Sequence, residues 1–172
     1  MVMHITRDDR LSEVDTLKAD IKRMMESNDW DERYIILRRI ASVARSDNDI
    51  ALHELVLSDV ERVIESFSSI GVEQGKRDGY IPSINLLVAA NRHTRSDTLE
   101  MLAKRSVMYG RHRGLDRDIE IEIVYNKRTP IPALNLLADR GFDQYIRNSA
   151  YRKLVAKTDN EINKRLSDRL RR

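Results

Sequence analysis

The sequence predicts an all-α protein, built as a short right-handed α-solenoid of about eight or nine helices. Its 172 residues include only 6 glycines and 3 prolines, and residues that favour helices over a turn-rich β-fold dominate. Residues 91–105 recur in register as residues 126–140, thirty-five positions later, with Asn, Thr, two Leu, Ala and Arg in the same places. A helical unit that repeats in this way is typical of stacked helical arrays.

The composition limits where the protein works and what it can bind. The absence of cysteine excludes disulfides, thiolate zinc sites and cysteine-held iron–sulfur clusters. No apolar run approaches the roughly 20 residues of a membrane span, and the N-terminal segment lacks the apolar core of a signal peptide. With 41% hydrophobic residues, the chain can form a continuous core. We therefore expect a soluble, cytoplasmic protein that does not contact membranes.

The formal net charge of +3 hides a difference between the two halves of the chain. Residues 1–86 contain 12 Lys and Arg against 17 Asp and Glu, whereas residues 87–172 contain 19 against 11. Such a split indicates binding to nucleic acid or to an acidic partner. Contact between the acidic half of one copy and the basic half of another would use the same charges, so a homo-oligomer is an open alternative.

Residues 1–70 form the acidic N-terminal part, in which apolar residues recur every three or four positions. This period predicts amphipathic helices at about residues 10–26, 30–44 and 50–70. Side chains that favour helix N-caps precede the second and third helices, and they are Asn28, Asp29, Asp47 and Asn48. We expect the third helix to be long, because its apolar series continues without interruption.

Residues 71–82 contain three glycines and a proline among charged residues, which predicts a loop. This loop separates the acidic part from a basic helical-repeat part in residues 83–172, and we expect the two parts to form one continuous domain. Its glycine spacing fits neither a P-loop nor a dinucleotide-binding fingerprint. A plain connector is therefore favoured over a binding loop, although long loops are often functional.

The basic part begins with a short apolar helix that ends at Asn91, followed by a helix that starts near Thr94 or Ser96. Residues 118–125 (DIEIEIVY) alternate apolar and acidic side chains, which by itself is the pattern of a half-buried strand. An isolated strand would have no pairing partner in a helical stack, and the repeat aligns this stretch with the short apolar helix. We therefore favour a helix over a strand here.

The second copy starts with Thr129 and Pro130, which have the order of an N-cap and a first helical residue. Gly141 is the expected stop signal for this helix. The remaining residues predict two more helices, with Thr158 as the cap of the last one.

Each copy begins with an Asn-x-x-Thr turn, which leads into a helix with regularly spaced leucines. This pattern resembles the leucine-rich repeat variant family, whose helical solenoid repeats look like HEAT repeats. The second copy carries the likeness at Asn126, Thr129, Pro130, Leu134, Leu137, Ala138, Asp143, Ile146, Arg147 and Ala150. The first copy retains Asn91, Thr94, Leu99, Leu102 and Ala103, and a fainter third copy aligns Leu52 with Leu99 and Leu55 with Leu102. The resemblance covers about half of the chain and implies a binding scaffold, since the family has no single activity.

Two departures from that family pattern matter. The thirty-five-residue spacing includes an insertion at residues 106–117 that a regular array would lack, and the cysteine-held cluster of some family members cannot form. The tetratricopeptide pattern fits the spacing but requires Trp, Leu-Gly and Tyr positions that are missing. A non-repetitive helical bundle, with two helix starts alike by chance, stays open as the alternative.

No arrangement of residues typical of an enzyme is visible, so we expect neither catalysis nor a cofactor. The four histidines, at positions 4, 53, 93 and 112, lack the spacing that places two metal ligands on one helical face. Asp47, Asp49, His53 and Glu54 cluster at a helix start, where capping already favours aspartate, so a metal site is not expected.

We expect cations around the insertion and in the repeat turns to carry the function. Guanidinium forks could bridge phosphates, and a tyrosine could stack on a base. Because equivalent turns of a solenoid align along one edge, these residues should form a single basic ridge for nucleic acid. The predicted site residues are Arg92, Arg95, Lys104, Arg105, Tyr109, Arg111, His112, Arg113, Arg117, Lys127 and Arg128, with His93 beside them.

Two other interpretations remain open at this stage. The arginines could simply be solvated or paired with neighbouring Asp and Glu side chains. The basic half could instead bind an acidic protein surface, which would make the protein an adaptor or a self-assembling structural protein.

Overall fold

The computed structural model describes residues 6–64, 83–109 and 114–170, and every regular element within these ranges is a helix. The helices are α1 (Arg7–Glu26), α2 (Trp30–Val43), α3 (Asp49–Leu57), α5 (Ile84–Ala90), α6 (Ser96–Tyr109), α7 (Gly114–Tyr125), α8 (Ile131–Arg140) and α9 (Gln144–Leu170). A further helical segment occupies residues 60–64. The predicted all-α class is confirmed for the described ranges, whereas the predicted loop at 71–82 lies outside them.

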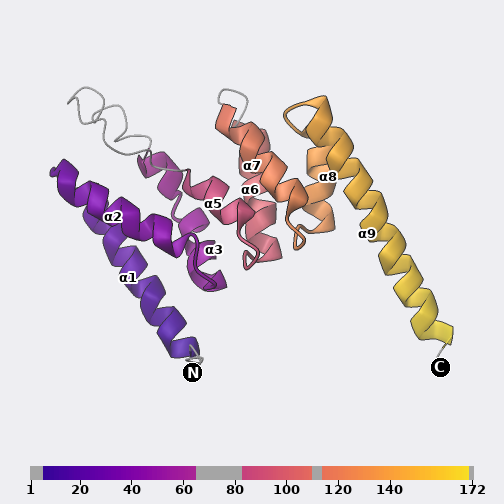
Figure 1. The fold of residues 1–172 in the computed structure, drawn as a ribbon, viewed down its shortest axis with the longest axis horizontal. Helices are drawn as coiled ribbons and strands as arrows, with labels where there is room; N and C mark the ends of the chain where they lie inside the picture. The colour runs from indigo at the N-terminus through magenta and orange to yellow at the C-terminus, as the bar shows by residue number, and fades with distance from the viewer. Residues whose placement is uncertain (1–5, 65–82, 110–113, 171–172) are drawn as a thin grey trace.

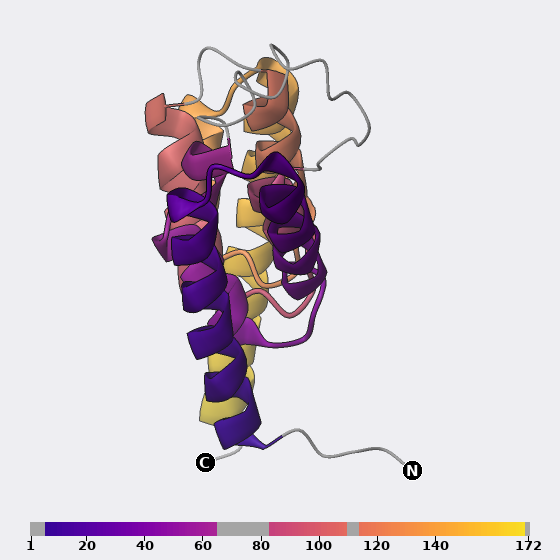
Figure 2. The ribbon, with the colours of Figure 1, turned by 90° about the vertical axis from the view of Figure 1, so that its left-hand side faces the viewer.

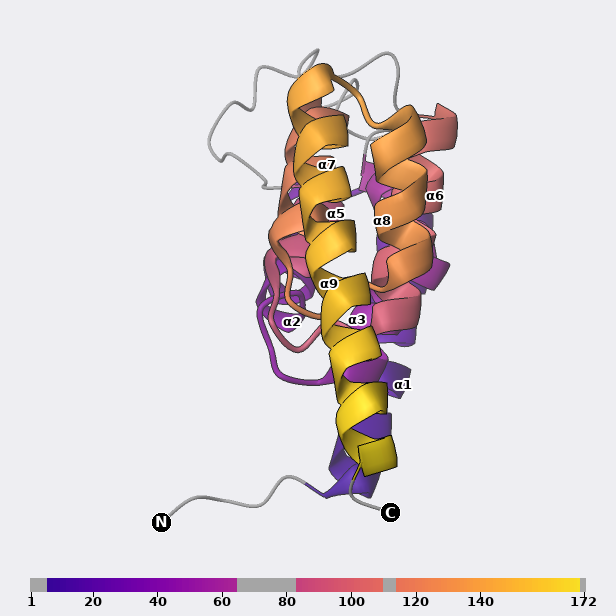
Figure 3. The same ribbon diagram turned by 90° about the vertical axis from the view of Figure 1, so that its right-hand side faces the viewer.

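The helices lie in two layers, and successive helices alternate between them (Figure 1). One layer contains α1, α3, α6 and α8 in that order, and the other contains α2, α5, α7 and α9. Figure 2 views this row from the end that carries α1 and α2, and Figure 3 views it from the end that carries α8 and α9. Because of the alternation, the turns that precede α3, α6 and α8 lie at the same edge, the lower one in Figure 1.

The core fills the space between the layers with apolar side chains from every helix. Leu52, Leu99 and Leu134 each have no exposed surface, and they occupy equivalent positions near the starts of α3, α6 and α8. The three leucines that the sequence aligns are thus buried at the same position of their respective helices. Truncation of any of them to alanine would cost about 2 to 5 kcal/mol, because a buried cavity would remain.

The predicted long third helix at 50–70 is wrong, because α3 ends at Leu57. Asp59 has a φ of 49°, in the left-handed region, and helical geometry resumes only at residue 60. Arg105 fixes this break: its guanidinium donates to the carbonyl of Val56 and pairs with the Asp59 carboxylate at 3.2 Å. The apolar period continues across the break, so the period gave no sign of it.

The C-terminal residues form one helix and not the predicted two. α9 runs for 27 residues, and the hydroxyl of Thr158, the expected cap, donates to the carbonyl of Leu154 inside the helix. The predicted boundary rested on the polar residues that begin at Thr158. Because no glycine or proline interrupts the stretch, these polar residues do not end the helix. No helix in the described part of the chain, α9 included, combines the length and the apolar character that a membrane span would need.

Residues 118–125 belong to α7, which confirms the preference for a helix over a strand. Ile119 and Ile123 lie one turn apart and are both buried, so the alternating pattern nevertheless presents an apolar helical face. The start of α8 differs from its prediction: Pro130 is the N-cap, without a side-chain capping bond. Thr129, the predicted cap, instead donates its hydroxyl to the carbonyl of Ile123 at the end of α7.

Candidate functional site

The Asn-x-x-Thr turns before α6 and α8 have the same internal hydrogen bonds. The hydroxyl of Thr94 donates to the carbonyl of Val88 at 2.6 Å, and the hydroxyl of Thr129 donates to the carbonyl of Ile123. Donor and acceptor of the second bond each lie thirty-five residues after those of the first. Both threonines are fully buried. They therefore close the end of the preceding helix onto the turn, and they are structural residues.

Each turn asparagine also connects its own turn to the one before it. The side-chain amide of Asn126 donates to the carbonyls of Ala89 and Asn91, both at 2.9 Å. The amide of Asn91 donates in the same way to the carbonyls of Ala44 and Ser46, at 3.1 and 2.8 Å. The side-chain oxygen of each asparagine accepts the backbone N–H two residues later. These contacts fix the position of each turn relative to the next along the edge.

Lys153 of α9 takes the place that a further asparagine would occupy. Its ammonium donates to the carbonyls of Val124 and Asn126, at 2.6 Å for the latter. These carbonyls lie thirty-five residues after those of Ala89 and Asn91, which the Asn126 amide binds. Burial, together with the positive charge of Lys157, lowers the pKa of Lys153 to about 8. The last turn is thus closed by cations.

Lys157 lies one helical turn further along α9 and contacts the same turn of the chain. Its ammonium donates to the carbonyl of Thr129 at 2.6 Å. Sequence reasoning missed Lys153 and Lys157, although their i,i+4 spacing on a predicted helix places both on one face. Which face of α9 contacts the turn follows from packing, so spacing alone did not connect them to the site.

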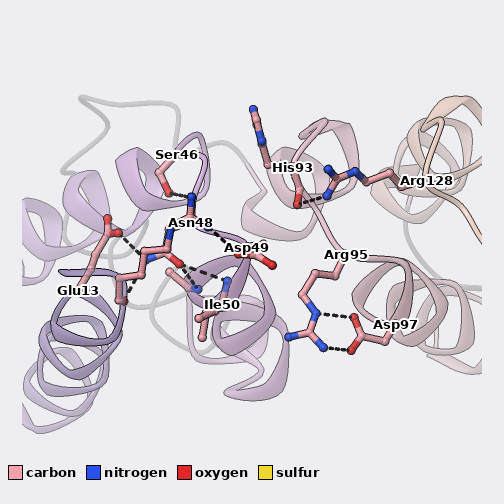
Figure 4. Close-up of polar contacts among 11 residues, drawn as sticks. Glu13, Ser46, Asn48, Asp49, Ile50, His93, Arg95, Asp97 and Arg128 are labelled. Atoms are coloured by element: carbon pink, nitrogen blue, oxygen red, sulfur yellow. Dashed lines mark hydrogen bonds and ion pairs between the residues drawn. The ribbon is translucent and has the colours of Figure 1, made fainter. Parts of the chain in front are cut away.

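The turns hold four of the predicted site residues, together with His93. Arg92 donates from Nε to His93 Nε2 at 3.0 Å, and Arg128 donates from Nη1 to the His93 carbonyl at 3.1 Å (Figure 4). Arg95 instead forms two hydrogen bonds with the Asp97 carboxylate, at 3.1 and 2.5 Å. Among the described residues, no carboxylate forms an ion pair with Arg92, Lys127 or Arg128, and all three are exposed.

The described cations around the insertion are on helices and already have acidic partners. Lys104 pairs with Glu100 at 2.7 Å, and Arg117 pairs with Asp143 at 2.7 Å. Arg105 binds the end of α3, as described above. The described parts of the insertion at residues 106–117 are helical, because α6 extends to Tyr109 and α7 begins at Gly114. Arg111, His112, Arg113 and the side chain of Tyr109 lie outside the described residues.

The structure separates the predicted ridge into two groups. The turns with Arg92 and Lys127 lie at the lower edge of Figure 1, whereas the end of α6 and the start of α7 lie at the upper edge. The 14 residues of α6 make a helix about 20 Å long, which keeps the two edges apart. The two Asn-x-x-Thr turns lie at one edge as expected, but the described residues around the insertion lie at the other edge.

The acidic cluster at the start of α3 is occupied by internal contacts. Asn48 caps α3, accepting from the backbone N–H groups of Ile50 and Ala51 (Figure 4). Asp49 pairs with Arg10 at 3.0 Å, and His53 Nδ1 lies 2.7 Å from the hydroxyl of a buried threonine of α6. Across the ranges that the structure describes, no three His, Cys, Asp or Glu side chains are grouped to hold a metal ion.

Two exposed tyrosines, which sequence reasoning did not single out, join the end of α7 to the start of α9. The hydroxyls of Tyr125, the last residue of α7, and Tyr145, in the first turn of α9, are 2.7 Å apart. Tyr125 directly precedes the Asn126 turn. The equivalent position in the first copy is Ala90. A comparison of the two copies would therefore have drawn attention to Tyr125 as an aromatic residue specific to the second copy.

Comparison with protein-family models, with curated proteins and with solved structures found no match to this chain. The resemblance of the turns to leucine-rich repeat variants therefore stays a prediction. Function has to be inferred from the positions of the side chains themselves.

Proposed function

We propose that this chain is a helical-repeat module, a short α-solenoid, that binds nucleic acid through cations at its turn edge. We call Arg92, Lys127, Arg128 and Lys157 the turn-edge cations. The observation that carries the proposal is that two consecutive turns and α9 bring these side chains to one edge, where no described carboxylate pairs with them. A row of unpaired cations is suited to a polyanion, whose phosphates would replace the missing carboxylates.

The order of the helices supports the solenoid part of the proposal. Each helix packs on the next helix of its own layer, so a unit contacts mainly its neighbours, as in repeat proteins. The asparagine amides that join one turn to the next repeat at equivalent positions, which a bundle with two helix starts alike by chance would not require.

The hydrogen-bonding capacity of the turn-edge arginines supports phosphate as the ligand. A guanidinium has five N–H donors, and Arg92 and Arg128 each use only one of them in the described contacts. The free edges of both groups could therefore form paired hydrogen bonds with phosphate oxygens. Elsewhere in the structure, Arg10, Arg23 and Arg39 already have carboxylate partners.

Binding of labelled DNA and RNA oligonucleotides over a range of salt concentrations tests the proposal. Affinity should fall steeply with salt, and Lys127→Glu should weaken binding and reduce the salt slope by about 1. Arg38→Glu is the matched control, because Arg38 is also exposed and without a described ion-pair partner, but it lies on α2, in the acidic half. Absence of binding at low salt, or an equal loss in the control, would contradict the proposal.

A protein-binding role is the second candidate, and the outer face of α9 favours it. Tyr151, Val155, Ile162 and Leu166 are all exposed, and their spacing places them along one face of the helix. Exposed apolar stripes often mark contacts with other proteins. Sedimentation over a range of concentrations tests a self-assembling form: Ile162→Asp with Leu166→Asp should abolish any association of the wild type, and a monomeric wild type would exclude self-assembly.

A further inference from the structure

We propose that the nucleic acid bound at the turn edge is single-stranded, and that its unpaired bases stack on Tyr125 and Tyr145. This inference rests on the function proposed above. The two rings come from neighbouring helices of one layer, α7 and α9, and remain 58% and 52% exposed although their hydroxyls are hydrogen-bonded to each other. Two large aromatic side chains thus meet at their hydroxyls and leave about half of their surface exposed to solvent.

Tyr125 directly precedes the Asn126 turn, whereas Tyr145 lies in the first turn of α9, about two helical turns before Lys153. Tyr125 is followed in the chain by Asn126, Lys127 and Arg128, so the ring and two cations leave the backbone within four consecutive residues. Lys153 binds the carbonyls on both sides of Tyr125, those of Val124 and Asn126. The backbone that carries the ring is therefore fixed, and a strand held by its phosphates at the turn would bring its bases to the aromatic pair.

The hydroxyl contact makes the rings suitable for stacking. A hydrogen bond between the two hydroxyls restricts the rotamers of both side chains before any ligand arrives, so less conformational entropy is lost on binding. The same bond raises the pKa of Tyr145 above its ordinary value. Positive charge beside exposed aromatic rings is the combination that single-strand binding surfaces use.

The distinction from duplex follows from access to the base faces. In a duplex each base face is already stacked on its neighbours, whereas an unpaired base can place one face on a tyrosine. Stacking of a base on an aromatic ring contributes about 1 to 3 kcal/mol, which corresponds to roughly 5- to 150-fold in affinity. Duplex should gain only the contacts of the turn-edge cations.

The experiment compares single-stranded oligothymidylate and oligouridylate with a duplex of the same length. The single strands should bind more tightly, and Tyr125→Ala should weaken their binding roughly 5- to 150-fold while duplex binding stays unchanged. Tyr125→Phe keeps the ring and loses the hydroxyl contact, so its loss should be smaller. Tyr151→Ala is the matched control, because Tyr151 is also exposed on α9 but forms no described contact with the tyrosine pair.

A second measurement does not depend on the variants. Photocrosslinking of the wild-type protein to 4-thiouridine-containing RNA, followed by peptide mass spectrometry, should place crosslinks at Tyr125 or Tyr145. Equal binding of duplex and single strand, unaffected by Tyr125→Ala, would overturn the stacking inference, and the turn-edge proposal would stand if Lys127→Glu still weakened binding. If no oligonucleotide bound at low salt, both proposals would be overturned.

Discussion

The side-chain amide of Asn126 donates a hydrogen bond to the backbone carbonyl of Asn91, the asparagine thirty-five residues earlier that begins the preceding Asn-x-x-Thr turn. Asn91 binds the carbonyl of Ser46 in the turn before that, and Lys153 binds the carbonyl of Asn126 in turn. A continuous series of side-chain contacts therefore runs along the turn edge, from α3 to α9. Three of the cations that we propose to bind nucleic acid, Arg92, Lys127 and Arg128, directly follow the asparagines of this series, and Lys157 lies one helical turn after Lys153.

Asn126→Ala should lower the free energy of unfolding by about 2 to 4 kcal/mol, because two buried or partly buried carbonyls would lose their donor. Urea unfolding followed by circular dichroism measures this change. The control is Asn135→Ala, an exposed asparagine of α8 with no described side-chain contact, which should change stability by no more than about 0.5 kcal/mol. Similar values for the two variants would show that the turn contacts contribute little.

Glu120 should make stability depend on pH in the acidic range. Burial raises the pKa of its carboxyl above the ordinary value of 4.5, although the backbone N–H of Phe142 donates to the carboxylate at 2.7 Å. Because the folded-state pKa is higher than the unfolded one, ionisation disfavours the folded state. The contribution of this group to stability is therefore most favourable below pH 4.5 and falls as pH rises through the raised pKa.

Glu120→Gln separates charge from hydrogen bonding at this position. The amide oxygen can still accept from Phe142, so at neutral pH the variant should be at least as stable as the wild type, with the difference disappearing in acid. Glu120→Ala removes the acceptor and should be destabilised at every pH. Unfolding in urea from acidic to neutral pH measures both, and a glutamine variant that is less stable only at neutral pH would contradict the assignment.

Gly141→Ala should destabilise the junction between α8 and α9. A Cβ at this position would lie 2.5 Å from the carbonyl oxygen of Leu137 and 2.8 Å from a methyl group of Ile146, and both neighbours are packed in place. Overpacking of this kind typically costs about 1 to 3 kcal/mol. Thermal unfolding measures the loss, with Asp139→Ala as an exposed control on the same helix end.

Arg105 and Lys104 are neighbours in the sequence, yet their substitution should have different effects. Arg105→Ala should cost about 1.5 to 3 kcal/mol, because its guanidinium holds the end of α3 at Val56 and Asp59. Lys104→Ala removes only an exposed pair with Glu100 and should cost less than about 0.5 kcal/mol. Equal stabilities in urea would contradict the structural role of Arg105. Neither change should weaken oligonucleotide binding as Lys127→Glu does.

The sequence by itself determined the helical class, the leucine positions of the core and the equivalence of the Asn91 and Asn126 turns. These features depend on local spacing, since the period of a helix and the geometry of a turn are set by residues a few positions apart. The helix of residues 118–125 also followed from the repeat, against its local strand pattern.

Only the tertiary structure decided which cations are available. Arg105 and Arg117 have acidic partners 46 and 26 residues away, and Lys153 reaches the Asn126 turn across 27 residues. The break at Asp59 likewise depends on a guanidinium from another helix. Pairing of charges depends on distance in space, and periodicity along one helix carries no information about which other helix lies opposite.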